Sequence, residues 1–429
     1  MRLGPQMVYR TRIIDEELDE LLAGFSAVAI EGPKAVGKTA TALQRAQTVY
    51  RLDDPAQASL GRADPARLAT GAAPVLVDEW QRVPEVWDII RRAVDEDPRP
   101  NRFLLTGSAT PTSPPTHSGA GRIVRLRLRP LSLVERGLET ATVSLRQLLS
   151  GGRTPVHGET PVQLTHYVEE IVASGFPAIR PLRGRARRAQ LEGYIARIVD
   201  KDFHEMGRPV RKPETLRRWM AAYAAATSTT ATVERIRSAA TGVEGGKPAR
   251  TTVASHRDTL HKLWVLDPVP AWLPSRNYFS RLAHPEKHHL VDPALAAVLL
   301  GVQADALLEG AESAVPMPRD GTLLGHLFES LVTQSVRVYA QAAEATVKHL
   351  RTKGGRHEVD LIVERPDHRV LAMEIKLGRD VSDRDVRHLH WLRDKVGSDL
   401  LDAVAVTTGS HAYRREDGIA VVPAALLGP

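Results

Sequence analysis

Residues 32–39 combine two glycines, a lysine and a threonine at the spacing of a phosphate-binding loop: Gly32-Pro33-Lys34-Ala35-Val36-Gly37-Lys38-Thr39. The apolar run 27–30 predicts a buried strand before this loop, and the Ala- and Leu-rich segment behind it predicts a helix, as the motif requires. The glycines let successive N–H groups surround a phosphate, the lysine reaches the β and γ oxygens, and the Thr39 hydroxyl ligates Mg²⁺. We therefore expect ATP and Mg²⁺ to bind along this loop as far as Ala40; the simpler alternative is a glycine turn beside a lysine.

Two acids follow a later apolar run. Residues 74–77 predict a strand that ends in Asp78 and Glu79. In a phosphate-loop ATPase, Asp78 would bind Mg²⁺ through its water shell, and Glu79 would polarise the attacking water. The alternative is an ordinary strand that ends in solvated acids.

A third strand, 102–106, places small hydroxyl groups at the edge of the sheet where ligands bind. Thr106 or Ser108 is expected to sense the γ-phosphate, and a plain turn is the alternative. The Pro-, Ser- and Gly-rich stretch 111–121 predicts a flexible connection, and 122–129 alternates basic and apolar residues as a half-exposed strand does. We interpret Arg122 as an arginine finger for a neighbouring subunit and the other arginines of this strand as a solvated edge.

The C-terminal part carries a second set of chemically active residues. Segments 359–363 and 370–376 predict neighbouring strands. Side chains two apart on a strand share a face, so Glu374 and Lys376 point together. With Asp360 they form an acid pair able to hold Mg²⁺, beside a lysine that orients or deprotonates the water attacking a phosphodiester. The alternative is a degenerate fold whose acids only form salt bridges.

The middle of the chain is predicted to be helical. The basic run 183–188 is interpreted as a solvated face. Helices around 219–226, 231–239 and 251–263, followed by two short strands at 265–266 and 270–272, predict a winged helix. In one interpretation its third helix presents polar residues to a DNA groove. In the other, the winged helix only mediates packing between domains. Those residues are Thr251, Thr252, Ser255, Arg257 and Lys262.

Composition narrows the protein class. A chain of 429 residues predicts two to four domains, and its net charge of +7 makes nucleic acid a plausible partner. It has no cysteine, which excludes disulfides and zinc–thiolate sites. We expect no signal segment and no membrane span, and hence a cytoplasmic protein.

The chain resembles the bacterial and archaeal AAA-type ATPases that carry a C-terminal restriction-endonuclease-like domain, DUF4143. Beside residues 32–39, the resemblance rests on groups spread over nearly the whole chain: Asp78-Glu79-Trp80-Gln81, Leu105-Thr106-Gly107-Ser108, Gly121-Arg122, Pro130-Leu131-Ser132, Glu135, Gly175-Phe176-Pro177, Tyr194, Asp202, Asp292-Pro293, Gly325 and Phe328-Glu329. The family usually has glutamine at Ala35, threonine or serine at Ala40 and proline at Val359. These departures remove no phosphate contact and no carboxylate.

The resemblance implies an α/β fold in four parts. These are an ATPase core with a parallel sheet at 1–140, a helical lid at 141–210, a winged-helix-like domain at 211–300 and a restriction-endonuclease-like α/β domain at 301–429. It also implies that Glu329 adds a metal ligand to Asp360 and Glu374.

The resulting expectation is a Mg²⁺-dependent ATPase coupled to a domain that binds DNA and that cleaves it if its acids are active. The alternative is a nucleotide-gated switch or scaffold that binds DNA or a partner protein without cutting. We also expect self-association into a homo-oligomer or under control of nucleotide.

Overall fold

A computed structural model describes residues 9–108, 120–241, 246–274, 284–309 and 322–429. The chain forms two compact units. The first contains the described residues up to Arg129 together with His204–Pro209 and Thr259–Val265, and the second contains Pro130–Phe203, Val210–Asp258 and Leu266–Pro429. Most of the predicted flexible stretch 111–121 lies outside the described residues.

The first unit is built on a five-stranded sheet in the order β2-β3-β4-β1-β5. Its strands are β1 (Ala27–Glu31), β2 (Thr48–Arg51), β3 (Val75–Asp78), β4 (Phe103–Gly107) and β5 (Ile123–Arg127). Every pairing is parallel, which confirms the predicted parallel sheet. In this register Glu31 lies opposite Gly107 and Asp78 opposite Thr106, so the carboxyl ends of β1, β3 and β4 meet at one edge.

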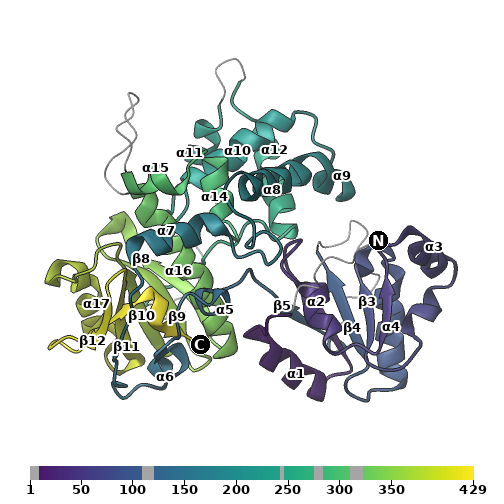
Figure 1. The fold of residues 1–429 in the computed structure, drawn as a ribbon, viewed down its shortest axis with the longest axis horizontal. Helices are drawn as coiled ribbons and strands as arrows, with labels where there is room; N and C mark the ends of the chain where they lie inside the picture. The colour runs from purple at the N-terminus through teal and green to yellow at the C-terminus, as the bar shows by residue number, and fades with distance from the viewer. Residues whose placement is uncertain (1–8, 109–119, 242–245, 275–283, 310–321) are drawn as a thin grey trace. The chain divides into compact units, whose positions relative to one another are not determined.

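Helices cover this sheet (Figure 1). They are α1 (Ile14–Gly24), α2 (Lys38–Leu43), α3 (Pro55–Ala63) and α4 (Glu85–Glu96), with 3-10 turns η1 (Pro65–Ala69) and η2 (Trp80–Arg82). From α4, Trp87 and Ile90 pack with Val77 and Leu105 in one apolar core. Helix α2 lies against β1, β3 and β4. The phosphate-binding loop therefore leaves the sheet directly into a helix, as predicted.

The second unit contains a seven-stranded mixed sheet in the order β7-β12-β13-β11-β10-β9-β8. Its strands are β7 (Gly158–Glu159), β8 (Thr346–Arg351), β9 (Glu358–Glu364), β10 (Val370–Ile375), β11 (Leu400–Thr407), β12 (His411–Arg414) and β13 (Ala420–Pro423). Strand β10 pairs antiparallel with β9 and parallel with β11.

Helices α16 (Thr322–Ala342) and α17 (Asp383–Val396) frame this sheet. Helix α17 contacts β9, β10 and β11, while α16 contacts β8 and β9. The chain order is thus α16, β8, β9, β10, α17, β11. This order places the predicted acidic residues on a helix and two adjacent strands.

The remaining elements of the chain are mostly helical. They are α5 (Leu133–Arg136), β6 (Val143–Ser144), α6 (Leu145–Ser150), α7 (Leu164–Ala173), α8 (Gly184–Arg197), the π-helical turn η3 (Ile198–Asp202), α9 (Phe203–Glu205), α10 (Pro213–Ala225), α11 (Val233–Ala239), α12 (Arg250–Lys262), α14 (Pro293–Leu299), α15 (Ala304–Glu309), the 3-10 turns η4 (Lys353–Gly355), η5 (Gly397–Asp399) and η6 (Ala424–Leu426), and β14 (Leu427–Gly428). Within the described ranges, no helix is long and apolar enough to cross a membrane.

The predicted hairpin after α12 is different in the structure. Leu266 pairs with Leu290 and Val269 with Lys287, whereas Ala271 pairs with His349 of β8. The segments 265–266 and 270–272 therefore find partners far along the chain and do not pair with each other. The sequence prediction failed here because it considered only neighbouring segments.

Candidate functional site

The loop between β1 and α2 has the backbone that phosphate binding requires. Gly32 has φ 152°, Ala35 has φ 63° and Gly37 has φ 106°. A Cβ at Gly32 would lie 2.3 Å from the carbonyl oxygen of Leu128, so only glycine fits this position. The loop is thus held close to the chain that follows β5.

Lys38 lies at the start of α2 and is almost fully buried. Its ammonium donates to the carbonyl oxygens of Gly32 and Pro33 at 2.9 and 2.8 Å. Burial lowers the pKa of Lys38 to about 8, although the charges of Glu79 and Asp78 oppose the shift. The lysine therefore stands inside the loop, close to both predicted acids.

Hydroxyl groups surround Asp78 at the carboxyl edge of the sheet. The Thr39 hydroxyl donates to Asp78 Oδ1 at 2.7 Å, and the Thr106 hydroxyl donates to the same oxygen. Carboxylate and hydroxyl oxygens are donors that suit Mg²⁺. Because Thr39 and Asp78 meet directly behind the loop, the residues fit the Mg²⁺ ion that accompanies ATP. Thr106, predicted as a phosphate sensor, contacts the acid that would hold this metal.

Glu79 adopts a left-handed backbone conformation, with φ 57°, just after β3 ends. Its carboxylate accepts a hydrogen bond from Ser108 at 3.1 Å and another from the Gln81 side-chain amide. The same amide donates to the Ser108 hydroxyl at 3.3 Å. Glu79 is thus positioned by two polar side chains, Gln81 from the turn η2 and Ser108 from the end of β4.

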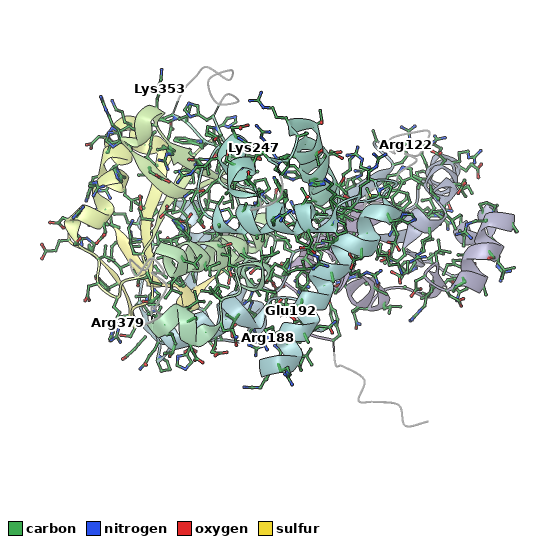
Figure 2. All side chains as sticks on the ribbon, turned by 90° about the horizontal axis from the view of Figure 1, so that it is seen from above. Arg122, Arg188, Glu192, Lys247, Lys353 and Arg379 are labelled. Carbon is green, nitrogen blue, oxygen red and sulfur yellow. The ribbon has the colours of Figure 1, made fainter. Side chains whose placement is uncertain are left out.

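Three other predicted residues of the ATPase site lie further out. Lys34 forms an ion pair with Glu205 at 3.0 Å, and Ala40 is exposed on α2. Arg122 lies at the surface, where Nε donates to Asp95 of α4 at 2.8 Å (Figure 2). Within one chain, the guanidinium of Arg122 therefore pairs with α4.

The second predicted site lies on β9 and β10. Lys376 Nζ lies 2.7 Å from Glu374 Oε2, which confirms that these side chains share a face. Asp360 accepts the backbone N–H of Ile375 at 2.9 Å, so its carboxylate is fixed against β10. Glu374 Oε1 is buried and has no hydrogen-bond partner among the described residues.

Charge and burial act differently on the two acids. Burial and the neighbouring Asp360 carboxylate raise the pKa of Glu374 well above its usual range, against the effect of Lys376. Burial alone would also raise the pKa of Asp360, but the charges of Lys287 and Lys376 hold it below its usual value. Asp360 is therefore the stronger acid of the pair.

The predicted metal set of Glu329, Asp360 and Glu374 is not assembled. In the described part of the chain, no group of three or more His, Asp or Glu side chains is arranged to hold a metal ion. Instead, the Lys287 ammonium lies 2.8 Å from Glu329 Oε1 and 3.2 Å from Asp360 Oδ1. In this arrangement the donor set does not fit a divalent metal.

The predicted DNA-reading residues of α12 are in mixed environments. Thr251 and Thr252 are exposed, whereas Ser255, Arg257 and Lys262 are half-buried. Arg257 is paired with Glu286. In the basic run 183–188, Arg188 lies 3.8 Å from Glu192, and the two side chains are at the surface of α8 (Figure 2). These contacts fit the predicted solvated face.

Sequence reasoning missed three residues of these sites. Arg12, almost fully buried, donates to the carbonyls of Val36 and Arg129 at 3.1 and 2.8 Å and so braces the loop. Gln81 was noted in the motif, but no contact with Glu79 was assigned to it. Lys287 sits in an unremarkable Lys-His-His sequence. A basic residue that is far from its partners in sequence gives no local signal.

Comparisons with known proteins cover most of the chain. Residues 24–136 match an AAA domain family, residues 164–306 a domain of unknown function (DUF8612) and residues 324–427 a domain of unknown function (DUF4143). Two proteins described as uncharacterised, from Mycobacterium tuberculosis and Mycobacterium bovis, are each 25% identical over 428 residues, which is 97% of this chain and 84% of theirs.

Two solved structures show partial similarity. The Walker-type ATPase paby2304 of Pyrococcus abyssi aligns with TM-score 0.39 and 15% identity, over 68% of this chain and 99% of its own. The RuvB Holliday junction branch migration motor of Thermotoga maritima aligns with TM-score 0.25 and 15% identity, over 60% and 89%. The family match at 24–136 and the loop geometry together identify an AAA-type ATPase domain in the first unit. The matches to an AAA domain and to DUF4143 agree with the resemblance expected from the sequence.

Proposed function

We propose that this chain is a Mg²⁺-dependent ATPase in which nucleotide turnover controls a restriction-endonuclease-like domain that binds DNA. The observation that carries the ATPase assignment is the meeting of Lys38, Thr39 and Asp78 at the carboxyl edge of the parallel sheet. A lysine and a hydroxyl at the start of the helix that follows a glycine loop, with a carboxylate at the end of β3, are the parts that phosphoryl transfer from ATP requires.

Each residue has a distinct task in this proposal. The backbone N–H groups of residues 32–40, except that of Pro33, which has none, cradle the phosphates. Lys38 turns from its own loop carbonyls to the β and γ oxygens. Thr39 and Asp78 would hold Mg²⁺, which when bound with ATP neutralises charge on those phosphates. Glu79 accepts a proton from the attacking water. Ser108 and Gln81 hold the Glu79 carboxylate in place.

Purified full-length protein tests this assignment by phosphate release from ATP with and without Mg²⁺. Lys38→Ala is expected to abolish nucleotide binding, because the γ-phosphate loses the ammonium that the loop directs toward it, whereas Lys34 is paired with Glu205. Lys353→Ala is a matched control, because it removes an exposed lysine of the second unit (Figure 2). Metal-independent hydrolysis, or equal rates in both variants, would overturn the proposal.

The fold of the second unit and the net charge of the chain support the proposal that the protein binds DNA. The order α16, β8, β9, β10, α17, β11, with Asp360 and Glu374 on adjacent strands, resembles the core of restriction-like nucleases, and the net charge of +7 favours a polyanion. Binding to linear duplex DNA should weaken steeply as salt rises and should respond to ATP. Binding that ignores both salt and nucleotide would contradict this part.

Two outcomes are possible for the bound DNA. If Asp360, Glu374 and Lys376 are catalytic, plasmid DNA is nicked in Mg²⁺ or Mn²⁺. The contact of Lys287 with Glu329 and Asp360 favours the second candidate, a nucleotide-gated switch that binds without cutting. Plasmid incubated with protein, ATP and either metal distinguishes the two.

A further inference from the structure

The outward face of helix α17 carries a row of basic and aromatic side chains. The row consists of Arg384, Arg387, His388 and Trp391. Their spacing of three, four and seven positions places them on one side of the helix. The other side supplies apolar residues to the core that packs against the sheet, so the two arginines point into solvent. We call this set the α17 row.

The arginines of the α17 row have no acid paired with them. Arg384 and Arg387 are exposed, and neither forms an ion pair within the ranges that the structure describes. The two acids in the first turn of the helix are engaged elsewhere. Asp383 pairs with an arginine in the turn after β12, and Asp385 belongs to the capping box. The row therefore presents positive charge to solvent.

The turn before β9 extends this surface. The His357 ring stacks on Trp391, with the ring centroids 4.0 Å apart and the planes at 7°. Its Nδ1 lies 3.4 Å from Nδ1 of His388. Arg356, the next residue toward the N-terminus, is exposed and has no ion pair in the described part of the chain. Two segments whose histidines are 31 positions apart in sequence thus form one basic surface.

The α17 row also lies beside the side chains of β9 and β10. Helix α17 contacts both strands. Burial is the main cause that lowers the pKa of His388, and the positive charges of Arg387 and Lys376 lower it further. The charge of Asp360 opposes this shift. These charges act on His388 because they are near it in space. A phosphodiester bound along the row would therefore lie close to Lys376.

We propose that the α17 row and Arg356 form the surface with which the second unit holds the phosphate backbone of duplex DNA. The inference rests on the proposed DNA binding and assigns residues to it. Seven helical steps from Arg384 to Trp391 span about 10 Å, and one DNA strand carries a phosphate about every 3.4 Å along the axis, so the row matches about three phosphates. Arginine suits this partner because its planar guanidinium donates to two phosphate oxygens at once.

The same features favour a duplex backbone over unpaired bases. Proteins that bind single strands stack the bases on free aromatic faces. Trp391 is half-buried and already stacked on His357. Contacts to phosphates carry no sequence information, so binding through this surface should be independent of DNA sequence.

The first test titrates full-length protein into a fluorescent duplex and measures anisotropy over a series of salt concentrations. Arg384→Ala combined with Arg387→Ala removes two phosphate contacts. The slope of log K against log salt should become shallower by about 1.8, and affinity at about 0.1 M salt should fall about 10–100-fold.

Arg183→Ala combined with Arg185→Ala is the matched control. These two arginines at the start of α8 are also exposed and have no ion pair among the described residues. This control should keep the wild-type slope. Because all four side chains are exposed, the unfolding temperature of both double variants should match that of the wild type.

A crosslinking experiment locates the DNA directly. The chain has no cysteine, so one introduced thiol can carry a photoreactive crosslinker. Asp394→Cys places the thiol at an exposed position on the outward face of α17, two turns beyond Arg387, and leaves the row intact. Gln190→Cys, exposed on α8, is the matched control. Duplex DNA should crosslink to the first variant and not to the second, and the crosslink should vanish when both arginines of the row are replaced by alanine.

Two results would overturn the inference while DNA binding by the wild type stands. One is an unchanged salt slope when both arginines of the row are replaced, and the other is equal crosslinking from α8 and α17. Failure of the wild type to bind duplex DNA at any salt concentration would instead defeat the proposed function, and this inference with it.

Discussion

Lys38 makes nucleotide affinity sensitive to alkaline pH. Burial lowers its pKa to about 8, and the negative triphosphate must raise that pKa again in the complex. Below pH 8 the lysine is already charged, so affinity for ATP should be constant. Above pH 8 binding must take up a proton, so affinity should fall by about tenfold per pH unit until the pKa of the complex is reached. Titration calorimetry from pH 7 to 9.5 measures this.

Lys38→Arg is the control for the pH effect. Arginine stays charged throughout this range, so any affinity that remains in the variant should not change with pH. A parallel decline in both proteins would show that another group titrates.

A substitution at Glu79 is expected to slow ATP turnover without weakening nucleotide binding. Glu79→Gln keeps the shape of the side chain and its contacts with Ser108 and Gln81, but the amide cannot accept a proton from water. We expect ATP affinity within a factor of a few of the wild type and kcat lower by about 10²–10⁴. The rate of ATP hydrolysis under single-turnover conditions measures the expected loss. A wild-type rate in this variant would move the assignment to another base, with Asp78 the first to examine.

Among single residues, the sequence predicted those with a fixed place in a motif. Lys38, Thr39, Asp78 and Glu79 lie together because a strand, a loop and a helix place them there. Lys287 was not predictable, because its partners Glu329 and Asp360 are 42 and 73 positions away. Nothing in its own neighbourhood distinguishes it from a surface lysine.

At the level of elements, the close approach of the phosphate-binding loop to the chain after β5 leads to a prediction. In Gly32→Ala the new methyl group would meet the Leu128 carbonyl oxygen at 2.3 Å, so the loop must move. We expect a loss of about 1–3 kcal/mol in unfolding free energy and weaker ATP binding. Chemical denaturation and nucleotide titration measure the two effects.

Gly24→Ala is the matched control, because its added methyl group meets nothing within 4 Å. It should change neither quantity by more than about 0.5 kcal/mol. Equal behaviour of the two variants would show that the contact with Leu128 does not constrain the loop.

Strands could be predicted from the sequence where an unbroken run of apolar residues marks them. Segments 27–30 and 359–363 lie within β1 and β9 because continuous apolar side chains mark buried strands. The predicted pairing of segments 265–266 and 270–272 was wrong: Leu266 pairs with Leu290 and Ala271 with His349, since a single backbone bridge leaves no periodic pattern. The sequence therefore predicted buried strands such as β1 and β9, but it did not predict the pairing partners of the segment after α12.

At the level of the whole molecule, Arg122 should act between subunits. It is exposed on the first unit, and its ion pair with Asp95 is solvated and so contributes little to stability. Arg122→Ala and Lys38→Ala should each be inactive alone, and a mixture should recover part of the ATPase activity through mixed interfaces. The rate of ATP hydrolysis over a series of mixing ratios measures this recovery. If the two variants co-assemble and no mixture hydrolyses ATP, Arg122 does not act in the neighbouring subunit's site.

Strands β6 and β14 form a parallel pair within the second unit, and Ser144 donates to the Pro429 carbonyl oxygen across 285 residues of sequence. At about 5–20 residues per second, a ribosome needs roughly 15–60 seconds to synthesise that interval. The five strands of the ATPase sheet have all been made before it begins, whereas β6 must wait for its partner. The second unit therefore completes its fold late, and its unfinished apolar surface stays open to chaperones for roughly 15–60 seconds.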